Sequence, residues 1–223
     1  QRIGKEISFF FAKRGWNIAI HFNKSKKEAL AVKKEIIKIG VKCCIVQANL
    51  SKYNEVKSII KKVSKKIGTI NCLVNCASIF ENDDIKKFNN QKWHSHFDIN
   101  LKAPAILCSE FAKQKNINNS NIINIIDQRV FKLTPYFFSY TLSKAGLQTL
   151  TKILAMKFAP NIRVNAIAPG PVMQNKRQSK LHFEKQFKNT ILQKQVRIED
   201  ICSAIEFIIN NHSITGMTIP VDS

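Results

Sequence analysis

The feature that most constrains the fold is the alternation of short, β-rich apolar runs with longer segments of helical periodicity. In one such segment Val56, Ile59, Ile60 and Val63 recur at the spacing of a single helix face. This alternation is typical of successive βαβ units around a mostly parallel sheet that is covered on both sides. We therefore predict an α/β fold whose visible strands are Asn17–Phe22, Val41–Gln47, Ile70–Cys76, Asn121–Ile126, Arg163–Ala168 and Met217–Val221.

The start of the chain departs from this pattern. Gln1–Lys13 already has helical periodicity, and no strand precedes it. In a doubly wound sheet the first strand is central, so its absence leaves an apolar slot whose two sides carry unpaired backbone groups. No linker interrupts the chain. We predict a single domain over residues 1–223, from which an N-terminal strand is missing.

The chain is strongly basic, with 36 Lys and Arg against 15 Asp and Glu and a net charge of +21. The charge comes mostly from lysines on the polar faces of the predicted helices, whereas a surface specific for nucleic acid favours arginine interleaved with aromatic residues. We interpret the lysines as solvated and expect no specific nucleic-acid partner. No apolar run is long enough to span a bilayer, and the first residues lack a secretory pattern. We expect a cytoplasmic protein with no membrane partner.

The residues that most often bind metals do not form a convincing site. The six cysteines include no C-x-x-C pair, and they are expected to be buried, reduced thiols. His94 and His96 have no Cys, Asp or Glu at a familiar zinc spacing nearby. We predict a helix-surface histidine pair and no metal.

Four short motifs occur in a fixed order: Asn75-Cys76-Ala77-Ser78, Asn100, Tyr140-x-x-x-Lys144 and Pro169-Gly170-Pro171. A spacing of four residues puts Tyr140 and Lys144 on the same face of a helix. A tyrosine hydroxyl exchanges protons poorly at neutral pH, because its ordinary pKa is about 10. We expect the lysine ammonium to lower that pKa, so that Tyr140 can exchange a proton with a substrate.

The order and context of these motifs resemble the short-chain dehydrogenase/reductase family over essentially the whole chain. The resemblance implies a Rossmann-type fold, a nicotinamide cofactor and catalysis by Tyr140 with Lys144, which also holds the nicotinamide ribose. It further implies that Asn100 distorts a helix and holds a water in the proton relay, and that Asn75 packs beside the cofactor.

Asp127 is the informative departure, because most of the family has serine at this position. Asp127-Gln128-Arg129-Val130 resembles the pteridine reductase branch, which includes dihydromonapterin reductases. A carboxylate can accept hydrogen bonds from the N–H groups of a pterin, whereas a serine suits a simple carbonyl better. The branch also implies that Ser78 contacts cofactor and substrate, that Phe80 stacks on the pterin, and that Arg2 reaches cofactor phosphate and pterin. Alternatively, Asp127 is a turn residue in a reductase of another specificity or of impaired activity, and Phe80 is ordinary core.

The expected cofactor is NADPH. After the first visible strand the chain has no carboxylate to hold the free ribose hydroxyls of NAD, while Lys24 with Asn23 and Ser25 can hold a 2′-phosphate. Gly4 stands at the start of the first helix, where backbone N–H groups bind pyrophosphate. With the resemblance, the cofactor-binding set is Arg2, Ile3, Gly4, His21, Asn23, Lys24, Ser25, Asn49, Leu50, Asn75, Ala77, Ser78, Tyr140, Lys144, Pro169 and Gly170.

The stretch Val172–Gln195 resembles the variable substrate loop of the family. Lys176 and Arg177 make it basic, which would suit an anionic tail such as a folate glutamate, although a plain solvated loop fits as well. The resemblance also implies a homotetramer built on helices near Gln91–Lys115 and Phe137–Ala159.

These observations predict an NADPH-dependent reductase of a pterin or dihydropterin, with dihydrofolate as a further candidate. Hydride would reach the carbon of a ring C=N bond, and Tyr140, coupled to Asp127, would supply the proton to the nitrogen. The nearest alternative is a carbonyl reductase acting on a substrate such as a 3-oxoacyl thioester. More remote alternatives are a cofactor-binding protein without turnover and a basic scaffold that binds nucleic acid.

Overall fold

The computed structural model describes residues 3–174 and 179–223. Its strands are β1 (Ile18–Phe22), β2 (Cys43–Gln47), β3 (Cys72–Asn75), β4 (Ser120–Ile125), β5 (Ile162–Pro169) and β6 (Thr218–Val221). Its α-helices are α1 (Ile3–Ala12), α2 (Lys26–Lys38), α3 (Tyr53–Ile67), α4 (Asn90–Phe97), α5 (Ala103–Ala112), α6 (Phe138–Phe158), α7 (Lys180–Lys188) and α8 (Ile198–Asn210). Three short segments are 3-10 or π-helical: η1 (Ile85–Lys87), η2 (Asp98–Lys102) and η3 (Gln128–Val130).

All six predicted strands are present, and every strand pairing is parallel. The order β3-β4-β5-β6 forms a four-stranded sheet, and β1-β2 forms a separate pair. The two central strands of the larger sheet, β4 and β5, are buried along their whole length. Their near-continuous apolar runs follow from this, because helices cover both of their faces.

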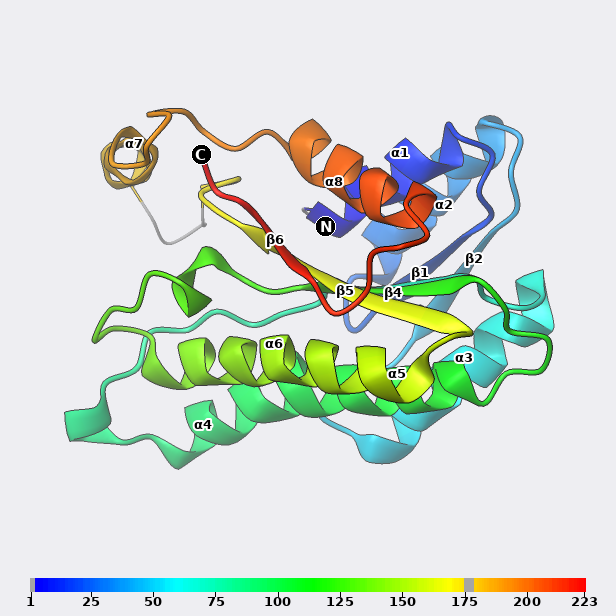
Figure 1. The fold of residues 1–223 in the computed structure, drawn as a ribbon, viewed down its shortest axis with the longest axis horizontal. Helices are drawn as coiled ribbons and strands as arrows, with labels where there is room; N and C mark the ends of the chain where they lie inside the picture. The colour runs from blue at the N-terminus through cyan, green and yellow to red at the C-terminus, as the bar shows by residue number, and fades with distance from the viewer. Residues whose placement is uncertain (1–2, 175–178) are drawn as a thin grey trace.

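The helices form two layers around the sheet, as Figure 1 shows. α1, α2 and α8 lie on one face, and α3, α5 and α6 lie on the other. The predicted stripe of α3 is buried, with Val56, Ile59, Ile60 and Val63 all inside the core. α3 ends at Gly68, whose φ of 87° is in the left-handed region that favours glycine. The predicted α/β doubly wound architecture is confirmed.

The edges of β1 and β3 are not hydrogen-bonded to each other. A cavity lies between them, lined by Ile18 and Ile20 from β1 and by Leu73 and Val74 from β3. The expected apolar slot is therefore present between the two sheets, and it opens into the larger cavity described below.

The segment predicted as a substrate loop, Val172–Gln195, is not wholly a loop. It contains α7, which begins after Ser179, whose side chain accepts a hydrogen bond from the backbone N–H of His182. The predicted basic residues Lys176 and Arg177 lie outside the described residues. Within the part that is described, no helix has the length and apolarity needed to cross a bilayer.

Candidate active site

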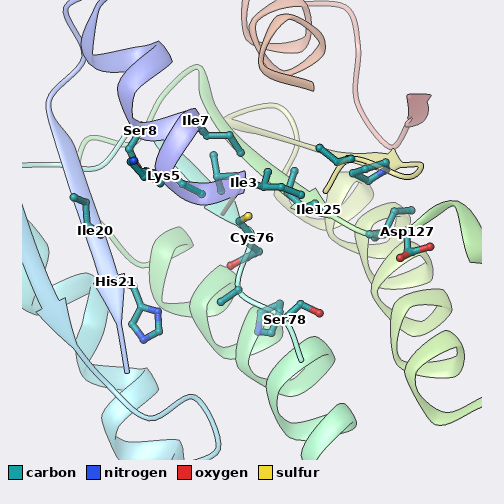
Figure 2. Close-up of a pocket in the computed structure, with 18 of the residues that line it drawn as sticks. Ile3, Lys5, Ile7, Ser8, Ile20, His21, Cys76, Ser78, Ile125 and Asp127 are labelled. Atoms are coloured by element: carbon teal, nitrogen blue, oxygen red, sulfur yellow. Dashed lines mark hydrogen bonds between the residues drawn. The ribbon is translucent and has the colours of Figure 1, made fainter. Parts of the chain in front are cut away.

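A cavity of about 2250 Å³ includes the slot between β1 and β3 and extends along the carboxyl ends of the strands. Figure 2 shows Ile20 and His21 of β1 on one side, Asp127 beyond β4 on the other, and Cys76 and Ser78 between them. In open parallel α/β sheets this edge is where ligands bind.

Most of the predicted site residues line this cavity. They are Ile3, Gly4, His21, Leu50, Asn75, Ala77, Ser78, Phe80, Asp127, Tyr140, Lys144, Pro169 and Gly170, together with Ser25. Asn23, Lys24, Asn49 and Asn100 do not line it. Arg2 lies outside the described residues. The fold therefore brings most of the predicted site residues together at one edge of the sheet, although they come from widely separated parts of the sequence.

Tyr140 and Asp127 are in direct contact. The Tyr140 hydroxyl donates a hydrogen bond to Asp127 Oδ2 at 2.8 Å. The other carboxylate oxygen accepts the backbone N–H of Arg129 at 2.9 Å, which fixes the orientation of Asp127 at the start of η3. The tyrosine is 5% exposed, so this bond is shielded from bulk water.

The expectation that Lys144 lowers the pKa of Tyr140 is wrong for this structure. Burial and then the adjacent Asp127 carboxylate raise the pKa of Tyr140 well above its ordinary value. The physical reason is that a phenolate here would lose water and face a carboxylate at hydrogen-bond distance. Tyr140 is therefore held in its protonated form, which suits a proton donor.

Lys144 is buried on the same helix face. Its ammonium donates to the backbone carbonyl of Ile125 at 2.8 Å and lies 5.9 Å from the centroid of the Tyr140 ring. Burial lowers the pKa of Lys144 to about 8, while Asp127 opposes that shift. Lys144 thus places a positive charge, or a readily titrated amine, beside the end of β4.

Asn100 lies at the centre of the π-helical segment η2, so the predicted helix distortion is confirmed. Its side-chain amide accepts from the Ser78 hydroxyl and from the Ile79 N–H, both at 3.0 Å. Its amide N–H groups donate to the Ile79 carbonyl and to Ser143 Oγ, each at 3.1 Å. Asn100 therefore fixes the backbone that carries Ser78, and its predicted role in a water relay stays a prediction.

Asn75 is the last residue of β3 and is buried. Its side-chain amide donates to Asn124 Oδ1 at 2.8 Å, and the Asn124 amide in turn donates to Thr151 Oγ1 at 2.9 Å. This chain of buried polar groups joins β3, β4 and α6 beneath the cavity. Asn75 therefore stabilises the floor of the site in addition to lining it.

Phe80 is 37% exposed, so it is not ordinary core. Its ring stacks on Phe137, with centroids 4.3 Å apart and planes 8° from parallel. The Tyr140 ring meets it edge-on at 4.7 Å. One face of Phe80 is thus covered by Phe137, and the ring of Phe80 is in contact with Tyr140.

The prediction of a histidine pair on the helix surface is wrong for His96, which is completely buried. Its Nδ1 lies 2.6 Å from Ser139 Oγ, and its Nε2 accepts the backbone N–H of Glu81 at 3.2 Å. Burial lowers its pKa, consistent with a neutral ring. His96 joins the loop that carries Phe80 to the residue before Tyr140. Among the described residues, no group of His, Cys, Asp or Glu could hold a metal ion.

At the β1 end of the cavity, two predicted contacts are already engaged within the fold. His21 Nε2 is 2.9 Å from the Ala48 carbonyl oxygen, and Asn49 Oδ1 accepts the Ser51 N–H at 3.0 Å. Lys24 is exposed just beyond β1. Their roles in cofactor binding stay predictions.

Two residues that the sequence did not single out, Arg129 and Phe137, also line the cavity beside Tyr140. Phe137 has a left-handed backbone with φ 57° immediately before α6. No pattern in the sequence signals this conformation, and the ring of Phe137 stacks on Phe80, which is distant in sequence. Arg129 follows Asp127 closely, and that proximity was the one available signal.

A doubly wound parallel sheet with a buried Tyr-x-x-x-Lys pair at its carboxyl edge defines a class of Rossmann-type oxidoreductases. The family model described as enoyl-(acyl carrier protein) reductase matches residues 1–223. The chain belongs to the short-chain dehydrogenase/reductase family. Among curated proteins it is 32% identical over 230 residues to the 3-oxoacyl-[acyl-carrier-protein] reductase FabG of Staphylococcus epidermidis, covering 99% of this chain and 93% of that protein.

Among solved structures, the chain is similar to FolM alternative dihydrofolate reductase 1 from Brucella canis, complexed with NADP. The two share 41% identity and a TM-score of 0.96, covering 100% of this chain and 88% of that chain. A blue fluorescent protein from a metagenomic library, in complex with NADPH, has a TM-score of 0.93 at 22% identity. The latter similarity concerns the fold alone.

Proposed function

We propose that the protein is an NADPH-dependent reductase of pterin or dihydropterin substrates, dihydrofolate included. The observation that carries this proposal is the hydrogen bond from Tyr140 to Asp127 at 2.8 Å, beside the partly exposed ring of Phe80. It combines a proton donor, an anionic acceptor for heterocyclic N–H groups and an aromatic surface for a flat ring. The similarity to FolM alternative dihydrofolate reductase 1 supports the same substrate class.

The cavity fits a dinucleotide cofactor. It extends from Ser25 and His21 past Gly4 and Ser78 to Tyr140 and Lys144. The start of α1 borders it with backbone N–H groups suited to phosphate, and Lys24, near the β1 end, is a candidate for the 2′-phosphate. NADPH supplies the hydride when it is bound.

In this proposal the proton comes from a side chain of the protein. Tyr140 donates its proton to the substrate nitrogen, because burial and Asp127 keep the hydroxyl protonated beforehand. The buried ammonium of Lys144 offsets the negative charge that then develops in the site. Asp127 orients the Tyr140 hydroxyl and has lone pairs left to accept N–H groups of the ring.

A second candidate is reduction of a 3-oxoacyl thioester, which the 32% identity to FabG favours. A carbonyl substrate needs a hydrogen-bond donor next to the catalytic tyrosine, whereas Asp127 as a carboxylate is an acceptor. The two candidates therefore differ in what they require at position 127.

Variants at position 127 test the proposal. Asp127→Ser and Asp127→Asn should each lower kcat for dihydrobiopterin by about a hundredfold or more, while the dissociation constant of NADPH changes little. Tyr140→Phe is the matched control for loss of the proton donor. Undiminished pterin turnover in Asp127→Ser, or a gain in acetoacetyl thioester turnover without any pterin activity in the native protein, would favour the second candidate.

The family resemblance predicts a homotetramer, and we keep that as part of the proposal. The helices on which it would rest, α4, α5 and α6, are formed as expected, and α6 carries the exposed apolar residues Leu142, Ile153 and Met156.

A further inference from the structure

The guanidinium of Arg129 lies beside the stacked rings of Phe80 and Phe137. Its Cζ is 4.8 Å from the centroid of Phe137 and 5.7 Å from that of Phe80. Because the two centroids are themselves 4.3 Å apart, the guanidinium flanks the stacked pair and does not cap its far side. Arg129 also lines the cavity that contains Asp127 and Tyr140.

This position is held by the fold. Arg129 Nη1 donates to Thr134 Oγ1 at 3.0 Å, and the guanidinium lies 4.8 Å from the centroid of the Phe137 ring. Phe137 reaches that place through a left-handed backbone, φ 57°, which is uncommon for a bulky residue. Phe137 thus contacts both Arg129 and Phe80 from an unfavourable backbone conformation. This arrangement indicates that the positions of Arg129 and Phe80 are fixed before a substrate binds.

The charge of Arg129 has no acidic partner among the residues that the structure describes. Asp127, the nearest acid in sequence, binds only the backbone N–H of Arg129 and the Tyr140 hydroxyl. The neighbouring cation of the same wall, Lys132, is paired with Asp222 at 2.9 Å. The Arg129 side chain is thus held in place beside Asp127 and Tyr140 in the cavity. Among the described residues, no acidic side chain neutralises its charge.

We propose that Arg129 binds a carboxylate of the substrate that lies beyond the reacting ring. The substrate would then be a pterin with an acidic tail, of the acyl-glutamate type, in preference to an unconjugated pterin. Arginine suits this role because its planar guanidinium can bind a carboxylate in a bidentate manner. The inference rests on the proposed function and adds to it the selection between two kinds of pterin.

The test compares two substrates that share the reacting ring. kcat/KM is measured for dihydrofolate, which carries carboxylates, and for dihydrobiopterin, which carries none. In Arg129→Gln we expect the ratio of kcat/KM for dihydrofolate to kcat/KM for dihydrobiopterin to fall about tenfold or more, mainly through KM for dihydrofolate. Arg129→Lys should recover part of the loss, and Lys132→Gln, in the same wall but paired with Asp222, serves as the matched control.

The outcomes separate the inference from the function it rests on. If the native protein reduces neither compound, the proposed function is contradicted and the inference falls with it. If Arg129→Gln slows both compounds equally or slows neither, the pterin reductase stands and the inference is wrong. Should Arg129→Gln fail to fold, Arg129→Lys decides: loss of the bidentate contact should lower kcat/KM for dihydrofolate relative to that for dihydrobiopterin, and an unchanged ratio would contradict the inference.

Discussion

The Tyr140 hydroxyl and Asp127 Oδ2 are joined by a partly buried hydrogen bond of 2.8 Å, which places a carboxylate against the tyrosine hydroxyl. The lysine of the Tyr-x-x-x-Lys motif does not offset this effect, because burial and Asp127 together raise the pKa of Tyr140. In this protein the pKa of Tyr140 is therefore raised first by its burial and then by the carboxylate at position 127.

The first prediction concerns that acidity. Asp127→Asn keeps the shape of the side chain and removes its charge, so the pKa of Tyr140 should fall toward its ordinary value of about 10. The ultraviolet absorbance of tyrosinate measures it. The chain has three tyrosines, so the signal of Tyr140 is identified by its loss when Tyr140→Phe is added to the variant. A third tyrosinate that appears at lower pH in the variant, and is absent from Asp127→Asn/Tyr140→Phe, is the expected result; identical titration curves would contradict it.

The second prediction concerns Lys144, whose pKa burial lowers to about 8. In the unfolded chain a lysine has a pKa of about 10.4, so between these values the unfolded state binds a proton that the folded state does not. Stability from this residue therefore rises with pH through that window. Relative to Lys144→Met, the native protein should gain roughly 1 to 3 kcal/mol of unfolding free energy between about pH 7 and pH 10.

Urea unfolding at the two pH values measures this difference. The exposed Lys152 of the same helix provides the control, because Lys152→Met should differ from the native protein by the same amount at both. A pH-independent difference for Lys144→Met would mean that Lys144 is not perturbed in the native protein.

The third prediction contrasts two glycines. A Cβ at Gly170 would lie 2.7 Å from Cα of Asp222, a backbone atom that cannot easily move. We expect Gly170→Ala to cost about 2 kcal/mol and to weaken NADPH binding, since Gly170 lines the cavity. At Gly146 the nearest atom is Leu101 Cδ2 at 2.8 Å, the end of a flexible side chain. Gly146→Ala should change stability by less than about 1 kcal/mol, because the gain in helix propensity offsets the contact. Equal thermal stabilities of the two variants would refute this contrast.

The fourth prediction concerns Arg163, a buried residue of β5. Its guanidinium donates to two backbone carbonyls in the last turn of α8, those of Ile208 and Ile209, and to two beyond the helix, those of Asn211 and Ile214. Arg163→Lys cannot reach all of them, and it should lower the unfolding free energy by about 2 to 4 kcal/mol. Arg197→Lys, at an exposed ion pair with Asp200, should change it by less than about 0.5 kcal/mol. A similar small effect at both positions in guanidinium unfolding would argue against the prediction.

The sheet could be predicted from the sequence because each strand is a compact apolar run, as in Asn121–Ile126, which matches β4 to within one residue at each end. α7 was missed inside Val172–Gln195, although Ser179 is a favoured N-cap and Phe183 and Phe187 share a helix face. The helix could not be recognised from apolar periodicity, because α7 is mostly polar and Phe183 is its one buried residue.

In the site, motif spacing located Tyr140, Lys144 and Asp127, because local sequence fixes which strand end or helix turn each occupies. The burial of His96 and the left-handed backbone of Phe137 could not be predicted this way. Both residues contact partners distant in sequence, Ser139 for His96 and Phe80 for Phe137. The sign of the pKa shift at Tyr140 was missed for the same reason, since it depends on a distance between two elements.

The proposed reduction of pterins by this oxidoreductase can be tested directly on the native protein. Its most direct test is kcat/KM of the native protein for a dihydropterin beside that for an acetoacetyl thioester, each followed by oxidation of NADPH. We predict that the dihydropterin is preferred by at least about a hundredfold, because the site holds an acceptor where a carbonyl substrate needs a donor. Preference for the thioester, or turnover of the thioester alone, would contradict the claim.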